Sequence, residues 1–279
     1  MPIHDQSYRR YGGGRAMPGQ AWLVIARAGI MTMLRKRAFL GLLLASWVPF
    51  LVRAVQIYLA ANYPQASLIA PTAETFRQFL AQQDFLVFIM TIYVGAGLIA
   101  NDRRANALQI YLSKPLMRSE YIAGKAAVLF SFVLFVTLVP ALLLLVLQVL
   151  FAGSFEFLQK NLFLFPAIIV ATLLEALLST FAMLALSSLS KSSRYVGILY
   201  AGIIFFTAAI YGVMVAITGS TRLAWLSLGA NLTQVIDVIF RLKPRYATPW
   251  PVSLIVILAI VALSISVLER RVRGVEIVT

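Results

Sequence analysis

Residues 123–151 read AGKAAVLFSFVLFVTLVPALLLLVLQVLF, and this stretch decides the class of fold. Its single charged residue is Lys125, which stands near its start. A helix needs about 20 apolar residues to cross the hydrocarbon core of a bilayer, so this stretch is long enough to span it. The whole chain agrees, because 61% of its 279 residues are hydrophobic and only 12% are charged, against about 25% charged residues in soluble domains. The sequence therefore predicts an integral membrane protein.

Five further apolar stretches predict an all-α, polytopic protein with six membrane helices. The second stretch is short, and it fits a bilayer only if Asp84 and Asn101 lie at the two membrane interfaces. Residues 1–18 read as a polar N-terminal tail, and residues 19–279 as one membrane domain. The predicted spans are residues 39–60, 85–100, 123–151, 162–187, 195–217 and 251–268.

The distribution of basic residues predicts the orientation of these spans. With the N-terminus inside, 17 of the 24 lysine and arginine residues fall on the inner side and six fall outside. Cytoplasmic loops carry the excess of lysine and arginine, so both termini are expected in the cytoplasm. The net charge of +14 is then explained by residues that flank membrane helices, and we expect no nucleic-acid partner.

Several catalytic chemistries are disfavoured by composition. The chain has no cysteine and one histidine, His4, so thiolate chemistry is excluded and histidine-dependent catalysis is disfavoured. A phosphate-binding P-loop requires G-x-x-x-x-G-K followed by serine or threonine. Gly124 and Lys125 are followed by Ala126, and Ser119 stands where the first glycine is required. We therefore expect no enzyme in this chain and no ATP hydrolysis by it.

Three segments outside the spans are predicted to be helical. Residues 19–38 combine apolar and basic side chains at helical spacing, which is typical of a helix lying at the membrane interface. Such a helix could anchor the chain in lipid or form part of a docking surface, and both interpretations stay open. Residues 220–240 predict one or two short helices at the outer leaflet before the last span, and residues 61–84 predict a short external helix.

One loop interrupts the apolar chain, residues 101–125, which read NDRRANALQIYLSKPLMRSEYIAGK. Residues 106–113 can form about two helical turns, and Pro115 ends them because Lys114 before it is disfavoured in the α region. The apolar side chains in these turns suit a groove in another protein, although an interfacial turn held by lipid is the alternative. These side chains are Leu108, Ile110, Tyr111 and Leu112.

Residues 97–125 resemble the corresponding loop of permease subunits of type-2 ABC exporters. The matching features are an acidic-basic pair, Leu-Ser-Lys-Pro, an arginine and Gly-Lys; the family's Gly-Thr is Asn106-Ala107 here, and asparagine tolerates a left-handed backbone better than most residues. The C-terminal sequence LERRVRGVEIV is also similar to the family's ending. The matching residues are Asp102-Arg103, Leu112 to Pro115, Arg118 and Gly124-Lys125.

The resemblance implies a function and partners. It implies a six-span permease of an exporter in a bacterial or archaeal cytoplasmic membrane, whose loop contains a coupling helix that docks on a separate ATPase subunit. It also makes the helix before the first span a connecting helix. ATP and Mg²⁺ would be bound by two ATPase subunits, and a second permease copy or homologue would complete the complex. The implied docking residues are Asp102, Arg103, Arg104, Leu108, Ile110, Tyr111, Leu112, Lys114, Pro115 and Arg118.

Two charged residues within the predicted spans leave other functions open. Arg53 and Glu175 each need a partner or a wet cavity, because a lone charge at the helix centre costs about 2.5–3.5 kcal/mol; they could pair with each other. An ion-coupled carrier or channel using these two residues is one alternative, and a non-transporting scaffold is another. By the family resemblance, spans two and five would line a cavity between two permeases, and the candidate lining residues are Gly95, Gly97, Phe205, Phe206 and Tyr211.

Overall fold

A computed structural model describes residues 20–63, 65, 70–107, 117–153 and 156–272 of the chain. Every regular element in these ranges is helical, which confirms the all-α prediction. The α-helices are α1 (Ala21–Leu34), α2 (Arg37–Ala45), α3 (Val48–Asn62), α4 (Ala73–Met90), α5 (Ala100–Arg104), α7 (Arg118–Ala152), α8 (Glu156–Lys160), α9 (Leu164–Leu189), α10 (Ser193–Thr218), α11 (Leu228–Ile239) and α12 (Trp250–Arg271). Two shorter elements join them, the π-helix η2 (Thr91–Gly95) and the 3₁₀ helix η3 (Thr221–Leu226).

Six helical segments of the described chain are long and apolar enough to cross a membrane, as predicted. All but the second lie within about five residues of the predicted bounds, and the first comprises α2 and α3. The segments are Arg37–Asn62, Ala73–Arg104, Arg118–Ala152, Leu164–Leu189, Ser193–Thr218 and Trp250–Arg271.

The prediction for the second span was wrong at its N-terminal end. The segment begins at Ala73 rather than at residue 85, and the side chains of Thr72 and Thr75 form a capping box there. Asp84 therefore lies within a long helix rather than at its end, and residues 73–84, the second half of the predicted external segment, belong to that helix. A hydropathy reading excluded this stretch from the span because of its polar residues, but the structure gives several of them partners inside the bundle.

The first span is divided into α2 and α3 at Ser46 and Trp47. Pro49 lies in the first turn of α3, where its missing N–H leaves no helical hydrogen bond unmade. The buried side chain of Gln83 on α4 donates from its amide to the Ser46 carbonyl, at 3.1 Å. A backbone break at membrane depth requires such a protein partner, so α4 stabilises the broken first span.

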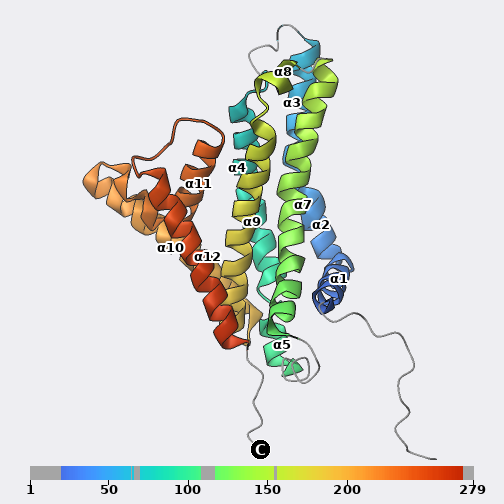
Figure 1. Cartoon of the computed structure of the whole chain (residues 1–279), viewed down its shortest axis with the longest axis vertical. Helices are drawn as coiled ribbons and strands as arrows, with labels where there is room; N and C mark the ends of the chain where they lie inside the picture. Colours follow the sequence, from blue (N-terminus) through green and yellow to red (C-terminus); the bar gives the residue numbers. More distant parts are fainter. Residues whose placement is uncertain (1–19, 64, 66–69, 108–116, 154–155, 273–279) are drawn as a thin grey trace, which may run out of the picture.

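The helices form two groups in space (Figure 1). In this view α4, α7 and α9 stand along the long axis, and α1 lies beside the lower part of α7. The second group, α10, α11 and α12, leans away from α9 toward the upper end. The short helices predicted for 220–240 are present as η3 and α11, and Val235 of α11 is buried in one cluster with Leu178 of α9 and Ile257 of α12.

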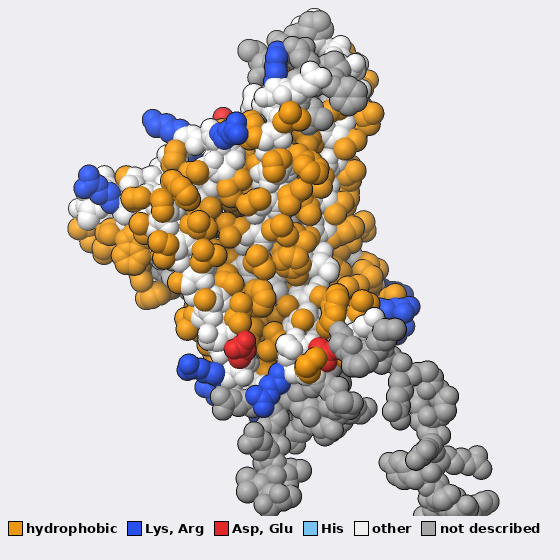
Figure 2. Space-filling view, viewed as in Figure 1, with side chains coloured by type: hydrophobic (Ala, Val, Ile, Leu, Met, Phe, Trp, Pro, Cys, Tyr) orange, Lys and Arg blue, Asp and Glu red, His pale blue; other side chains and the backbone are white. Residues whose placement is uncertain are grey.

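The two ends of the molecule differ in what they hold. The start of α1, the helix α5 and the end of α12 lie together at the lower end, which we call the α5 end, and α8 lies at the opposite end (Figure 1). Figure 2 shows hydrophobic side chains over most of the surface between the ends, with lysine and arginine gathered toward them. This distribution is expected of a protein whose middle is in contact with lipid.

Candidate functional site

The second membrane span is interrupted close to the α5 end. The helix α4 passes into the π-helix η2, and a turn at residues 96–99 follows before α5 begins at Ala100. The hydroxyl of Ser187 on α9 accepts hydrogen bonds from the backbone N–H groups of Ile99 (3.1 Å) and Ala100 (3.0 Å). The same hydroxyl donates to the Ala96 carbonyl at 2.9 Å. One buried side chain of α9 thus satisfies three backbone groups of the interrupted helix.

Three further contacts hold α5 against its neighbours. The carboxylate Oδ2 of Asp102 accepts a hydrogen bond from the Tyr121 hydroxyl and pairs with Lys125 Nζ, both at 2.7 Å. The Arg103 guanidinium donates to the Ser188 carbonyl on α9. We call this set the anchor cluster, because it joins α5 to both α7 and α9. Its residues are Asp102, Arg103, Tyr121, Lys125, Ser187 and Ser188.

The segment that follows the loop is also held in place. The side chain of Glu120 accepts a hydrogen bond from the Met117 N–H at 3.0 Å, which caps the first turn of α7. Gly124 lies where α1 crosses this turn, since an added Cβ would be 2.8 Å from the Trp22 carbonyl oxygen. The Gly-Lys pair of the family resemblance therefore has a structural explanation: glycine permits the close crossing of α1 and α7, and Lys125 pairs with Asp102.

The loop itself is described only in part. Leu108, Ile110, Tyr111, Leu112, Lys114 and Pro115 lie outside the described residues, so the coupling helix stays a prediction. Asn106 follows α5 with a φ of 52°, the left-handed conformation that asparagine tolerates. Of the predicted docking cations, Arg104 and Arg118 are exposed and accessible to a partner. Arg103 and Asp102 are used in the anchor cluster, and their part in docking stays a prediction.

The structure does not bring Arg53 and Glu175 together as a pair. Arg53 instead donates to the side-chain oxygens of Gln56, Gln78 and Gln82, at 2.8–3.3 Å. Glu175 is 4% exposed, and its Oε2 has no hydrogen-bond partner among the described residues. The three glutamines accept the hydrogen bonds of Arg53, whereas one oxygen of the Glu175 carboxylate has no hydrogen-bond partner in the described part of the chain.

The residues predicted to line a cavity between two permeases are absent from the walls of the two main pockets among the described residues. Phe205 and Phe206 are 63% and 67% exposed on α10, and the ring of Tyr211 contacts that of Tyr246 with centroids 5.7 Å apart. Gly95 packs closely against Met183 and Leu129, and Gly97 against Asn101. Whether any of these residues faces a second copy stays a prediction.

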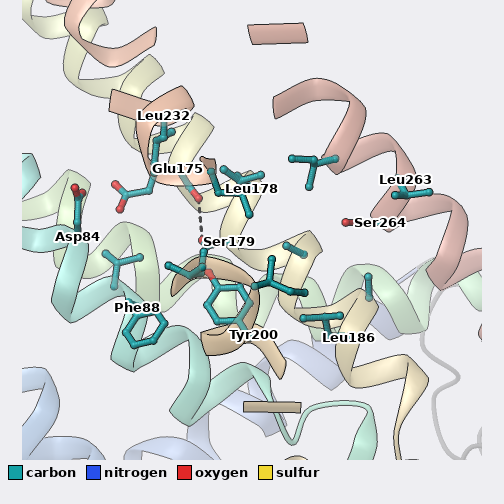
Figure 3. Close-up of a pocket in the computed structure, with 18 of the residues that line it drawn as sticks. Asp84, Phe88, Glu175, Leu178, Ser179, Leu186, Tyr200, Leu232, Leu263 and Ser264 are labelled. Atoms are coloured by element: carbon teal, nitrogen blue, oxygen red, sulfur yellow. Dashed lines mark hydrogen bonds between the residues drawn. The ribbon is translucent and has the colours of Figure 1, made fainter. Parts of the chain in front are cut away.

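A pocket of about 380 Å³ lies instead between α4, α9, α10, α11 and α12. Its walls are mostly apolar, but Asp84 and Glu175 contribute two carboxylates (Figure 3). The sequence analysis missed Asp84 as a site residue because it placed this residue at the membrane interface. The available signal was the spacing of Arg77 and Asp84, seven residues apart on one helix face once 73–90 is taken as one helix.

A buried ion pair beside this pocket was also missed. Arg77 Nε lies 2.7 Å from Asp237 Oδ1, and their side chains are 2% and 1% exposed. The more exposed Arg245 lies 3.2 Å from the other oxygen of Asp237. This group joins α4 to α11. The sequence analysis had placed Arg77 and Asp237 in two separate external segments, residues 61–84 and 220–240.

The fold and these sites define a class, that of polytopic α-helical integral membrane proteins. The comparison with protein families is more specific: the model of the ABC-2 family transporter protein matches residues 23–272. The chain therefore belongs to the ABC-2 family of transporter proteins and is an ABC-2-type permease, as the loop resemblance predicted. Membership implies that the chain works with ABC ATPase subunits. No curated protein matches the chain.

Proposed function

We propose that this permease is the membrane half of an ATP-driven exporter, and that the loop at residues 101–125 couples it to separate ATPase subunits. The observation that carries the proposal is the anchor cluster, which ties α5, at the start of this loop, to α7 and α9. A partner that displaces the loop would therefore move the second span, α7 and α9 together.

The coupling mechanism follows from these contacts. ATP and Mg²⁺ bound between two ATPase subunits would bring those subunits together and move the predicted helix at 106–113. Ser187 would pass the movement to α9, and the Asp102–Lys125 pair would pass it to α7. The π-helix and turn at residues 91–99 are the part of the second span where bending costs least, because the regular helical hydrogen bonds are already interrupted there.

The same proposal includes the orientation and a second permease copy. The start of α1, α5 and the end of α12 lie at one end (Figure 1), which supports both termini in the cytoplasm with the loop. The exposed Arg104 and Arg118 are then available to acidic groups of the ATPase. The exposed apolar side chains of α10, among them Phe205 and Phe206, are available to contact lipid or a second copy of the chain.

The test is copurification with candidate ATPases after residues 108–112 are replaced by Gly/Ser. We expect the ATPase to be lost from the complex and its stimulation by the permease to disappear. Lys243→Ser, an exposed change at the other end of the molecule, is the matched control and should leave both unchanged. Unchanged binding and turnover in the loop variant would contradict the proposal.

An ion-coupled carrier is the second candidate, and the unpartnered carboxylate of Glu175 is the observation that favours it. Arg53 no longer supports this candidate, because its donors are occupied by glutamines. In a carrier, Glu175→Gln would abolish transport while the loop replacement would leave transport intact. Loss of transport in the loop replacement would instead assign the protein to ATP-driven transport.

A further inference from the structure

The pocket between the two helix groups places two carboxylates among apolar side chains. Asp84 enters it from α4 and Glu175 from α9, and Tyr200 of α10 lies across from them (Figure 3). The remaining wall is mostly aliphatic, with Leu178 and Leu232 among its residues. In Figure 3 the carboxylate of Glu175 is directed toward the side of the pocket on which Asp84 lies.

The cations nearest these carboxylates form their direct ion pairs with a third carboxylate, that of Asp237. Arg77 and Arg245 both contact Asp237, at 2.7 and 3.2 Å. No ion pair of Asp84 or Glu175 occurs among the residues that the structure describes. In this part of the described chain the three carboxylates of Asp84, Glu175 and Asp237 thus outnumber the two arginines by one formal charge.

One oxygen of the buried Glu175 carboxylate also lacks a neutral hydrogen-bond donor among the described residues. Its Oε2 has no hydrogen-bond partner within the described part of the chain, although the side chain is only 4% exposed. The nearby Ser179 hydroxyl donates to the backbone carbonyl of Glu175 instead, at 2.8 Å (Figure 3). Buried polar atoms are nearly always satisfied, so this carboxylate points to a missing positive or donating group.

The chemistry of the walls selects among cations. Small hard metal ions require about six oxygen ligands, and the described residues contain no group of three acidic or histidine side chains that could hold a metal. A cation with an apolar body fits better, because the aliphatic walls would contact the body and the carboxylates its charge. The volume of the pocket, about 380 Å³, lies within the range of small-molecule pockets, about 300–1,000 Å³.

We propose that this pocket binds a lipophilic organic cation with a single positive charge, held between Asp84 and Glu175. The apolar part of the ligand packs against Leu178 and Leu232, and the ring of Tyr200 is available to the cationic centre. The site lies within one permease chain. This proposal rests on the proposed function, because it names a class of transported molecule, but the binding step itself needs no ATPase.

The experiment measures binding of radiolabelled tetraphenylphosphonium to the full chain in lipid nanodiscs, with empty nanodiscs subtracted. Tetraphenylborate has the same shape and the opposite charge, so it separates charge recognition from partition into lipid. We expect saturable binding of the cation that tetraphenylborate does not displace. Glu175→Gln and Asp84→Asn should each weaken this binding by about tenfold, because each removes a charge-assisted contact.

Two further variants keep the test independent of folding defects. A Cβ added at Gly229, which lines the pocket, meets no atom within 4 Å, so Gly229→Phe adds bulk at the pocket wall and should weaken binding without changing any charge. Glu269→Gln removes an exposed carboxylate of α12 outside this pocket and should leave binding unchanged. Binding that is absent, or equal in all four variants, overturns the proposal. A proton shared between Asp84 and Glu175 would then explain the two carboxylates.

This result is separable from that of the loop experiment. Loss of ATPase coupling in the loop variant with no cation binding supports the exporter and overturns the cation site. Cation binding together with an unaffected ATPase supports the site and contradicts the coupling proposal.

Discussion

Ser187 is the residue on which the interrupted second span depends most directly. Its hydroxyl contacts three backbone groups at residues 96–100, and all of them are buried with it. Leaving a buried donor or acceptor unsatisfied costs about 1–3 kcal/mol, more than a hydrogen bond contributes when it is made. A single hydroxyl at this position therefore decides whether the turn is stable.

The first prediction concerns this hydroxyl. Ser187→Ala should destabilise the protein by about 2–3 kcal/mol and should increase hydrogen exchange at the amides of Ile99 and Ala100. The matched control is Ser188→Ala, because the equally buried Ser188 hydroxyl bonds only within its own helix, to the Ala185 carbonyl at 2.6 Å. Equal exchange at the two amides in both variants would contradict the role given to Ser187.

At the scale of elements, α11 is fixed to α4 by a buried charge pair. Arg77 and Asp237 are 160 residues apart in the chain and lie in direct contact, with side chains that are almost inaccessible. Removing one partner of a buried pair leaves an uncompensated charge, which costs about 3–5 kcal/mol, whereas replacing both by apolar residues is often neutral. The pair thus determines where α11 packs, whatever its net contribution to stability.

The second prediction follows from this asymmetry. Asp237→Leu should destabilise the chain by about 3–5 kcal/mol, measured by thermal unfolding in nanodiscs. The double variant Arg77→Leu/Asp237→Leu should recover most of that loss. Glu74→Gln, at an exposed position of the same helix α4, is the control and should change stability little. A double variant as unstable as the single one would show that the two charges do not act as a pair.

At the scale of the whole molecule, the arrangement predicts which end faces the cytoplasm. Arg104 lies at the α5 end and Lys243 follows α11, and both are exposed. Because the chain contains no cysteine, a single introduced cysteine reports on its own position without background. Lys243→Cys should react with a membrane-impermeant maleimide in intact cells, and Arg104→Cys only after the membrane is opened. The reverse pattern would place the loop outside and contradict coupling to a cytoplasmic ATPase.

The sequence alone determined the number of membrane helices and the family. Apolar stretches such as 123–151 are long enough that no soluble packing could cover them, and the loop motif around Lys114-Pro115 is readable without any structure. The helix at 228–239 was also predictable, because its apolar residues recur at helical spacing.

Only the tertiary structure decided where the second span begins and where the pocket lies. A hydropathy reading places Arg77, Gln83 and Asp84 outside the membrane, because a polar group alone in lipid is costly. Here Asp237 of α11 compensates Arg77, and the broken first span accepts a hydrogen bond from Gln83. These partners come from distant parts of the chain, so their effect on the cost of burial cannot be read from a local window of sequence.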